Sequence, residues 1–194
     1  MILSNMEIIN CMNAGLFTIG GIAGVDPTKP PFNTSAVDLR LGDEVFEPDQ
    51  VPTPLQLDLT TPGIAQHLAK NGKSFKISQS QPYSLSPNKL VLARTLEVVD
   101  FPLLNSSSIC YSARVEGKSS LARCGILVHF TAPTIHAGFR GSITLEIINL
   151  GINKLLLTPE MYVCQLIIEE VKGLPSGAPS QFHGQSNAVG NTNP

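Results

Sequence analysis

The sequence predicts an all-β fold, a distorted barrel or jelly roll with one or two short helices. Short apolar and β-branched runs recur along the chain, and Gly, Pro or Asn residues separate them. Many short strands at such spacing are typical of barrels and jelly rolls. The strands expected from these runs are residues 75–77, 90–99, 126–131, 142–149 and 162–171.

Two short helical segments are expected between these strands. The first covers residues 62–70, where Thr61 can cap the first turn and Pro62 suits the first helical position. An Asn-Gly pair follows and can end that helix. A second helical turn is expected to begin at Ser119 or Ser120.

The chain is expected to form one β domain over residues 1–172, followed by a flexible tail over 173–194. A chain of 194 residues is long enough to bury roughly 70% of the surface that its unfolded form exposes. The tail is rich in Gly, Ser, Pro and Asn, a composition that cannot build a core. Such a tail either stays disordered or orders over a ligand as an active-site lid.

Composition and charge exclude several classes of protein. The net charge is −2 and 14% of residues are charged, so no broad basic field favours nucleic acid. No run approaches the ~20 apolar residues that span a bilayer, and no signal peptide is apparent. The four cysteines show no metal-binding or disulfide spacing, which favours reduced thiols in the cytoplasm and argues against a structural zinc site.

One carboxylate interrupts an otherwise apolar strand. In the run ITLEII, alternation places Ile143, Leu145 and Ile147 on one face and Glu146 on the other. An ionised carboxylate in such a strand needs a cation, a hydrogen-bond network or a ligand to compensate its lost hydration. Arg123 is the candidate partner, and a purely structural ion pair between the two is the alternative.

A Gly-Lys-Ser-Ser turn precedes the second expected helical turn. Its backbone, the cation of Lys118 and the hydroxyls of Ser119 and Ser120 suit phosphate oxygens. An ordinary capped turn explains the same residues. The histidines are weaker candidates, and His129 is expected to be a strand histidine with a satisfied hydrogen bond.

Several segments together resemble the dCTP deaminases of the dUTPase-like superfamily. The central ones are EGKSSLAR, TAPTIHAGF and GFRGSITLE, between residues 116 and 146. SAVDLRLG and LVLARTLEVV lie upstream, and MYVCQL and the weaker QFHGQ lie downstream. The resemblance covers most of the chain from about residue 33 to 185. It implies a dUTPase-like β fold and the hydrolytic deamination of dCTP to dUTP and ammonia, in the supply of dUMP and dTTP.

The resemblance also implies roles for individual residues. Glu146 would shuttle protons, Arg123 would help to hold the attacking water, and Ser119 would hydrogen-bond near the same centre. The implied nucleotide-binding residues are Lys118, Ser119, Ser120, Leu121, Ala122, Arg123, Ala132, His136, Thr144, Leu145, Glu146, Gln165 and Gln185.

The family implies no zinc, and the zinc-deaminase signature is absent from this sequence. Magnesium would enter on the triphosphate of the substrate, dCTP or dUTP, because Mg²⁺ coordinates phosphates without a protein cage. The family also implies a homotrimer with sites shared between neighbouring subunits. Neither nucleic acid nor a membrane is expected as a partner.

Three departures from the family pattern leave alternatives open. His136 stands where the family commonly has an Asp that binds the sugar, and Ser176 and Gln181 replace lid tyrosine and lysine-tyrosine positions. One alternative is a bifunctional enzyme that also cleaves dUTP to dUMP and pyrophosphate. The others are a non-catalytic nucleotide-binding homologue and a purely structural jelly-roll module.

Overall fold

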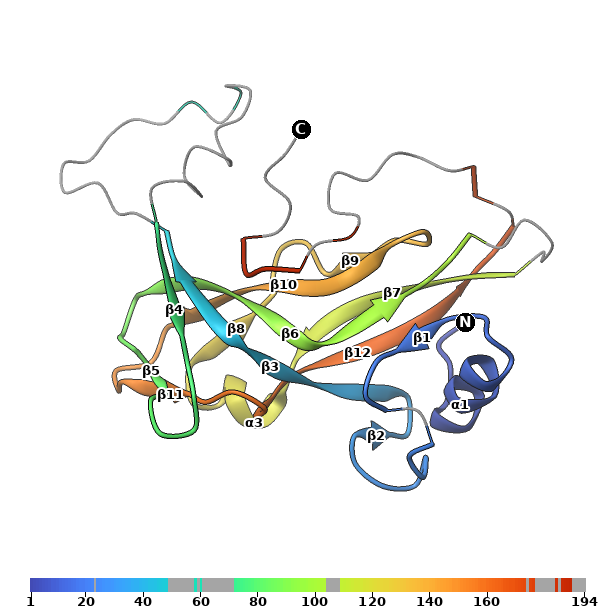
Figure 1. Cartoon of the computed structure of the whole chain (residues 1–194), viewed down its shortest axis with the longest axis horizontal. Helices are drawn as coiled ribbons and strands as arrows, with labels where there is room; N and C mark the ends of the chain where they lie inside the picture. The colour runs from blue at the N-terminus through green and yellow to red at the C-terminus, as the bar shows by residue number, and fades with distance from the viewer. Residues whose placement is uncertain are drawn as a thin grey trace.

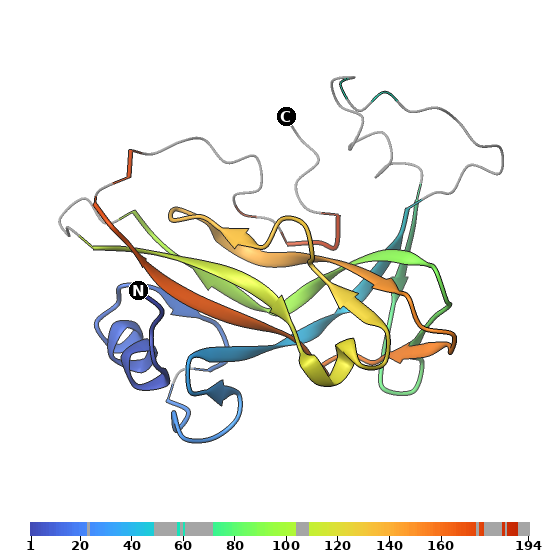
Figure 2. The same cartoon turned by 180° about the vertical axis from the view of Figure 1, so that it is seen from behind.

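The computed structural model consists mainly of one strongly curled β-sheet (Figure 1, Figure 2). It describes residues 1–22, 24–48, 58, 60, 72–103, 109–173, 175–176, 184 and 186–189. Helix α1 (Asn5–Asn13) lies at one end of the sheet, and a small second sheet lies towards the other. The predicted all-β class is confirmed.

The main sheet contains ten strands in the order β8-β10-β6-β3-β12-β7-β9, with β1 added on β6 and with β2 and β4 added on β3. Its strands are β1 (Thr18–Ile19), β2 (Phe32–Asn33), β3 (Ala36–Glu47), β4 (Lys73–Lys76), β6 (Leu90–Asp100), β7 (Cys110–Gly117), β8 (Ile126–Val128), β9 (Thr134–Ile135), β10 (Arg140–Asn149) and β12 (Tyr162–Val171). The second sheet pairs β5 (Tyr83–Leu85) with β11 (Leu155–Leu157). All pairings between the named strands are antiparallel.

The longest predicted strands are confirmed as β6, β10 and β12. The strand predicted over 126–131 was wrong beyond Val128, because His129 has a φ of 52° that does not continue a strand. Strands β3 and β7 were not predicted, since charged residues interrupt their apolar runs.

The helical turn predicted at Ser119 is confirmed as α3 (Ser119–Ala122), between β7 and β8. The helix predicted over 62–70 lies outside the described residues. Helix α1 was not predicted, although its sequence carries a start signal. The side chain of Ser4 accepts a hydrogen bond from the backbone of Glu7, a Ser-x-x-Glu arrangement typical of helix N-termini.

Strand β10 follows the alternation that its sequence predicts. Ile143, Leu145 and Ile147 are fully buried in the core, whereas Thr144 and Glu146 lie half-buried on the outer face of the sheet. The core continues across the neighbouring strands through apolar side chains that include Ala93 of β6, Leu41 of β3 and Leu166 of β12. The catalytic candidate therefore points away from the core.

Two buried polar side chains of β6 join three strands. The carboxylate of Glu97, 3% exposed, accepts hydrogen bonds from the backbone N–H of Arg40 at 2.8 Å and from its Nε at 2.7 Å. The hydroxyl of Thr95 donates to the carbonyl of Glu97 at 2.8 Å and accepts from the backbone N–H of Ile143 at 2.9 Å. These bonds tie β3, β6 and β10 together where both ladders shift register.

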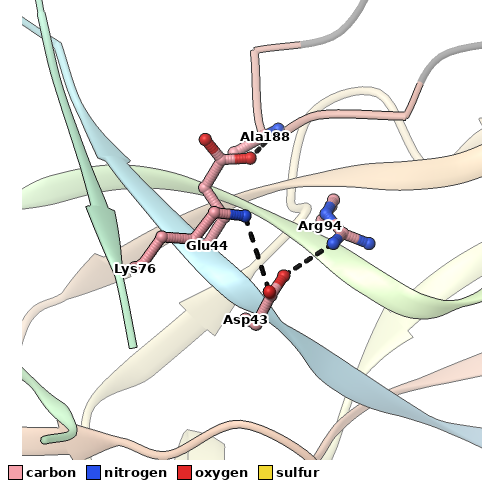
Figure 3. A network of polar contacts seen from close by, with 5 residues as sticks. All are labelled: Asp43, Glu44, Lys76, Arg94 and Ala188. Carbon is pink, nitrogen blue, oxygen red and sulfur yellow. Dashed lines mark hydrogen bonds and ion pairs between the residues drawn. The ribbon is translucent and has the colours of Figure 1, made fainter. Parts of the chain in front are cut away.

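The described part of the C-terminal tail lies against the chain's own sheet. Gly184 donates its backbone N–H to the carbonyl of Arg140 at 2.6 Å. Ala188 is fully buried and donates its N–H to Oε2 of Glu44 at 3.4 Å (Figure 3). The tail thus reaches from the start of β10 to β3.

Candidate functional site

The carboxylate of Glu146 approaches the imidazole of His129. Oε2 of Glu146 and Nδ1 of His129 are 2.7 Å apart, and the side chains are 35% and 7% exposed. The backbone of His129 returns to the same strand, because its N–H donates to the carbonyl of Glu146 at 2.8 Å. The tight turn after β8 therefore places the imidazole directly beside the carboxylate.

Burial and the histidine act on the pKa of Glu146 in opposite directions. Burial raises the pKa, whereas the close contact and the charge of His129 lower it more strongly. The net effect is a pKa below the ordinary value, so Glu146 stays ionised at neutral pH. An ionised carboxylate is the form that can accept a proton from water.

Several polar atoms around this carboxylate lack an aligned hydrogen bond among the described residues. They are Nε2 of His129, Oγ1 of Thr144 and Nε of Arg94, whereas Nδ1 of His129 and Oε2 of Glu146 contact each other. The expectation of a strand histidine at position 129 was wrong, because His129 lies beyond β8 with a φ of 52°, but its Nδ1 has a partner in the carboxylate of Glu146. Buried polar atoms normally have partners, so this part of the outer face has unused capacity for the polar groups of a ligand or for water.

A second cluster forms around Asp38 on β3. Its carboxylate pairs with Nζ of Lys118 and accepts a hydrogen bond from Nε2 of Gln165 at 3.1 Å. Asn33 donates to the same carboxylate at 2.9 Å, and the ring of Tyr162 lies 5.8 Å from the Lys118 ammonium. Two predicted nucleotide contacts, Lys118 and Gln165, are thus brought together by an acidic residue that was not predicted as part of the site.

Helix α3 carries the other polar candidates of this cluster. Ser119, Ser120, Ala122 and Arg123 are exposed, and Leu121 packs its half-buried side chain against the core. The carbonyl of Lys118 accepts the N–H groups of Leu121 and Ala122, which fixes the turn. The side chain of Arg123 makes no hydrogen bond or ion pair with the described residues, so within one chain the neighbour of Glu146 is His129.

The Glu146 and Lys118 clusters lie far apart in one chain. Glu146 pairs with Leu92 of β6, which pairs with Phe46 near the end of β3, whereas Lys118 contacts Asp38 near its start. A strand rises about 3.3 Å per residue, so these two positions on β3 are separated by roughly 25 Å. The two clusters of one chain therefore lie towards opposite ends of β3.

The remaining predicted residues lie on the loop around β9 and in the tail. Ala132 and His136 are exposed, and the loop is held on β7 by a 2.8 Å hydrogen bond from the N–H of Val115 to the carbonyl of Pro133. Leu145 is fully buried, so only its backbone could meet a ligand. Ser176 is exposed, whereas Gln181 and Gln185 lie outside the described residues.

No group of three or more His, Cys, Asp or Glu side chains suited to a metal ion occurs among the described residues. In the same part of the chain, no helix is long and apolar enough to cross a membrane.

A sequence model of the dCTP deaminase-like family matches residues 2–171. This chain belongs to that family. A dCTP deaminase, dUMP-forming, from Methanosphaera stadtmanae is 35% identical over 194 residues, which cover 100% of this chain and 91% of that protein. A dCTP deaminase from Halorubrum lacusprofundi is 33% identical over 174 residues, covering 89% of this chain and 78% of that protein.

A solved structure shares the fold. The crystal structure of 2'-deoxycytidine 5'-triphosphate deaminase from Agrobacterium tumefaciens matches with a TM-score of 0.61 and 19% identity, over 88% of this chain and 47% of that one. The likeness concerns the fold alone, and it agrees with the predicted dUTPase-like architecture. This chain spans about half the length of that structure.

Replacing His129 by Asn should raise the pKa of Glu146. The burial that raises this pKa stays, whereas the opposing contact is lost. Asn also tolerates the positive φ at this position. If activity needs the ionised carboxylate, kcat/KM should fall at a higher pH in this variant as the solution is made more acidic. The matched control is His136→Asn on the exposed loop, and a fall at the unchanged pH in His129→Asn would contradict the assignment.

Proposed function

We propose that this protein hydrolyses dCTP to dUTP and ammonia. The observation that carries the proposal is the ionised, half-buried Glu146 on the outer face of β10, beside His129 and several unused polar atoms. Its strand carries the segment GSITLE, which resembles a motif of the dCTP deaminases, and it lies within the residues that match the family. Similar proteins include one named dCTP deaminase. Carboxylate chemistry and family membership thus favour the same reaction.

The reaction needs two proton transfers at one carbon of the cytosine ring. Glu146 would take a proton from water as its oxygen attacks C4, and would then deliver a proton to the amino group as the C4–N bond breaks. Loss of ammonia leaves a hydroxyl at C4, and the shift of its proton to N3 gives the uracil carbonyl, so atoms and protons balance. We propose that this route runs without zinc, since the chain lacks the H-x-E and P-C-x-x-C signature of zinc deaminases.

The Lys118 cluster would bind the phosphates. Lys118 and the exposed hydroxyls of Ser119 and Ser120 come from one turn, and Gln165 lies beside them through Asp38. Mg²⁺ would arrive on the triphosphate and neutralise part of its charge. A cytoplasmic location is also proposed, because the four cysteines, exposed Cys124 included, are free thiols.

We further propose a homotrimer in which each site combines Glu146 of one subunit with Ser119 and Arg123 of its neighbour. The support is the separation of the two clusters within one chain, together with the exposed side chain of Arg123. A symmetric assembly brings different surfaces of identical chains together and repeats the same site at every interface.

Replacing Glu146 by Gln should abolish deamination and leave dCTP affinity within a few-fold. The amide preserves the shape but cannot transfer protons, and general acid–base catalysis typically contributes about 10²- to 10⁴-fold. The assay incubates dCTP with Mg²⁺ and resolves dCTP, dUTP, dUMP and ammonia, with binding measured separately by calorimetry. Glu170→Gln, at an exposed carboxylate of β12, is the matched control.

Two outcomes of that assay would contradict the proposal. Unchanged turnover in Glu146→Gln would remove the residue from the chemistry. A wild-type protein that binds dCTP and releases no ammonia would instead be a non-catalytic nucleotide-binding protein.

Two inactive variants should restore activity when their subunits are mixed. Glu146→Gln chains retain Arg123, and Arg123→Ala chains retain Glu146, so random mixing in a cyclic trimer rebuilds about a quarter of the shared sites. The measurement is ammonia release after co-expression, compared with the Glu146→Gln/Arg123→Ala double variant co-expressed with either single variant. No recovery from the complementary pair would place both residues in the same chain's site.

A second candidate activity adds cleavage of dUTP to dUMP and pyrophosphate. The observation in its favour is the relative from Methanosphaera stadtmanae, which is named dUMP-forming and matches along this whole chain. The exposed His136 is the opposing observation, because the family commonly has an Asp at this position.

Replacing His136 by Asp should therefore strengthen nucleotide binding and increase the share of dUMP among the products. A carboxylate accepts hydrogen bonds from a sugar hydroxyl and can orient water more strongly than a neutral imidazole. Product ratios and the KM for dCTP give the measurement, and His136→Asn separates loss of the imidazole from gain of the carboxylate. Equal affinities and product ratios in all three proteins would show that residue 136 lies away from the sugar.

A further inference from the structure

Arg94 lies on the same outer face as Glu146, although the sequence did not indicate it as a site residue. Arg94 of β6 pairs with Thr144 of β10, and Thr144 comes two residues before Glu146 on β10. The side chain of Arg94 is 20% exposed, and its Nη2 donates to Oδ1 of Asp43 at 2.6 Å (Figure 3). A cation is therefore held close to the candidate catalytic strand.

Two neighbouring polar atoms at this point lack hydrogen-bond partners among the described residues. They are Nε of Arg94 and Oγ1 of Thr144, and both are buried. The guanidinium thus uses one part of its donor fork on Asp43 and keeps another unused. Arginine forks of this kind fit the oxygens of carboxylates and phosphates, and such charge-assisted hydrogen bonds are the strong ones.

The backbone of β3 makes room for this arrangement. A Cβ placed on Gly42 would lie 3.1 Å from Cγ of Arg94, so a larger residue would press on the side chain. Asp43 follows directly and also contacts Nζ of Lys76 at 3.5 Å. Lys76 is 70% exposed, so Asp43 lies between a fixed cation and a solvated one.

The position of Arg94 suits the part of a nucleotide beyond its base. Two residues along β10 span about 6.6 Å and one strand spacing is about 4.8 Å, which together separate the backbones of Glu146 and Arg94 by roughly 8 Å. The long side chain adds to this distance because it extends towards β3. With the reacting ring at Glu146, a group that reaches the guanidinium must be sugar or phosphate.

We propose that Arg94 binds a phosphate oxygen of the nucleotide, and that Asp43 holds its guanidinium in place for this contact. The inference rests on the proposed function, because it takes Glu146 as the position of the base. Arg94 is thereby a residue that determines specificity for phosphorylated substrate. It takes no part in proton transfer.

The test measures binding in the Glu146→Gln background, where turnover is removed. Arg94→Gln should weaken dCTP binding by about tenfold to hundredfold, the usual effect of losing a charge-assisted hydrogen bond. Binding of deoxycytidine, which has no phosphate, should not change. Lys76→Gln is the matched control, because it also removes a cation from Asp43 but is exposed to solvent.

Two results would overturn the proposal. One is an equal effect of Arg94→Gln and Lys76→Gln on dCTP, and the other is an equal loss of dCTP and deoxycytidine binding in Arg94→Gln. Thermal unfolding shows whether the variants fold. If Arg94→Gln does not fold, the binding measurement is made with Arg94→Lys instead. Lysine keeps the charge but lacks the planar donor fork of arginine. Unchanged dCTP affinity in Arg94→Lys also overturns the proposal.

The same measurements separate this inference from the deaminase proposal. A wild-type protein that binds dCTP without releasing ammonia refutes deamination, and the binding ratio of Arg94→Gln still decides the role of Arg94. A wild-type protein that deaminates dCTP, with Arg94→Gln binding dCTP normally, refutes only the role of Arg94.

Discussion

The buried carboxylate of Glu97 is the interaction on which the layout of the sheet depends. An unpartnered carboxylate in this position would be strongly destabilising, so the two hydrogen bonds from Arg40 must form when β3 meets β6. Thr95 extends the same linkage to Ile143 of β10. The ladder between β10 and β6 shifts register here, because Thr95, Leu96 and Glu97 stand opposite Ile143. The ladder between β3 and β6 shifts register next to it, between Leu41 and Val45. The polar linkage therefore specifies how three central strands align.

This alignment decides which side chains point towards the outer face of the sheet. Beyond the register shift, Thr144 pairs with Arg94 and Glu146 with Leu92, and all four side chains point outward while Leu145 fills the core. A slip by one residue would bury Glu146 and expose Leu145. The same long β3 keeps the Lys118 cluster at its other end. The length of one strand thus separates the Glu146 and Lys118 clusters within the chain.

Features that depend on local sequence pattern were predicted from the sequence. Contacts between residues distant in the sequence were not predicted. Alternation in β10 was sufficient to place Glu146 on the outer face. Nothing in the local pattern indicated that His129 would leave the strand with a φ of 52° and meet that carboxylate, or that Asp38 would take Lys118. The motif SAVDLRLG contained Asp38, Arg40 and Gly42, but their roles require strands distant in sequence.

The cations on the outer face share one physical arrangement. Lys118 is held by Asp38, Arg94 by Asp43 and Arg40 by Glu97. Each carboxylate fixes the geometry of its cation and neutralises much of its long-range field. A chain with a net charge of −2 thus attracts a polyanion weakly at a distance and must select it by contact. Under the proposed function, contact with phosphate depends on which donors remain unused after each pair has formed, and the Nε of Arg94 is one of them.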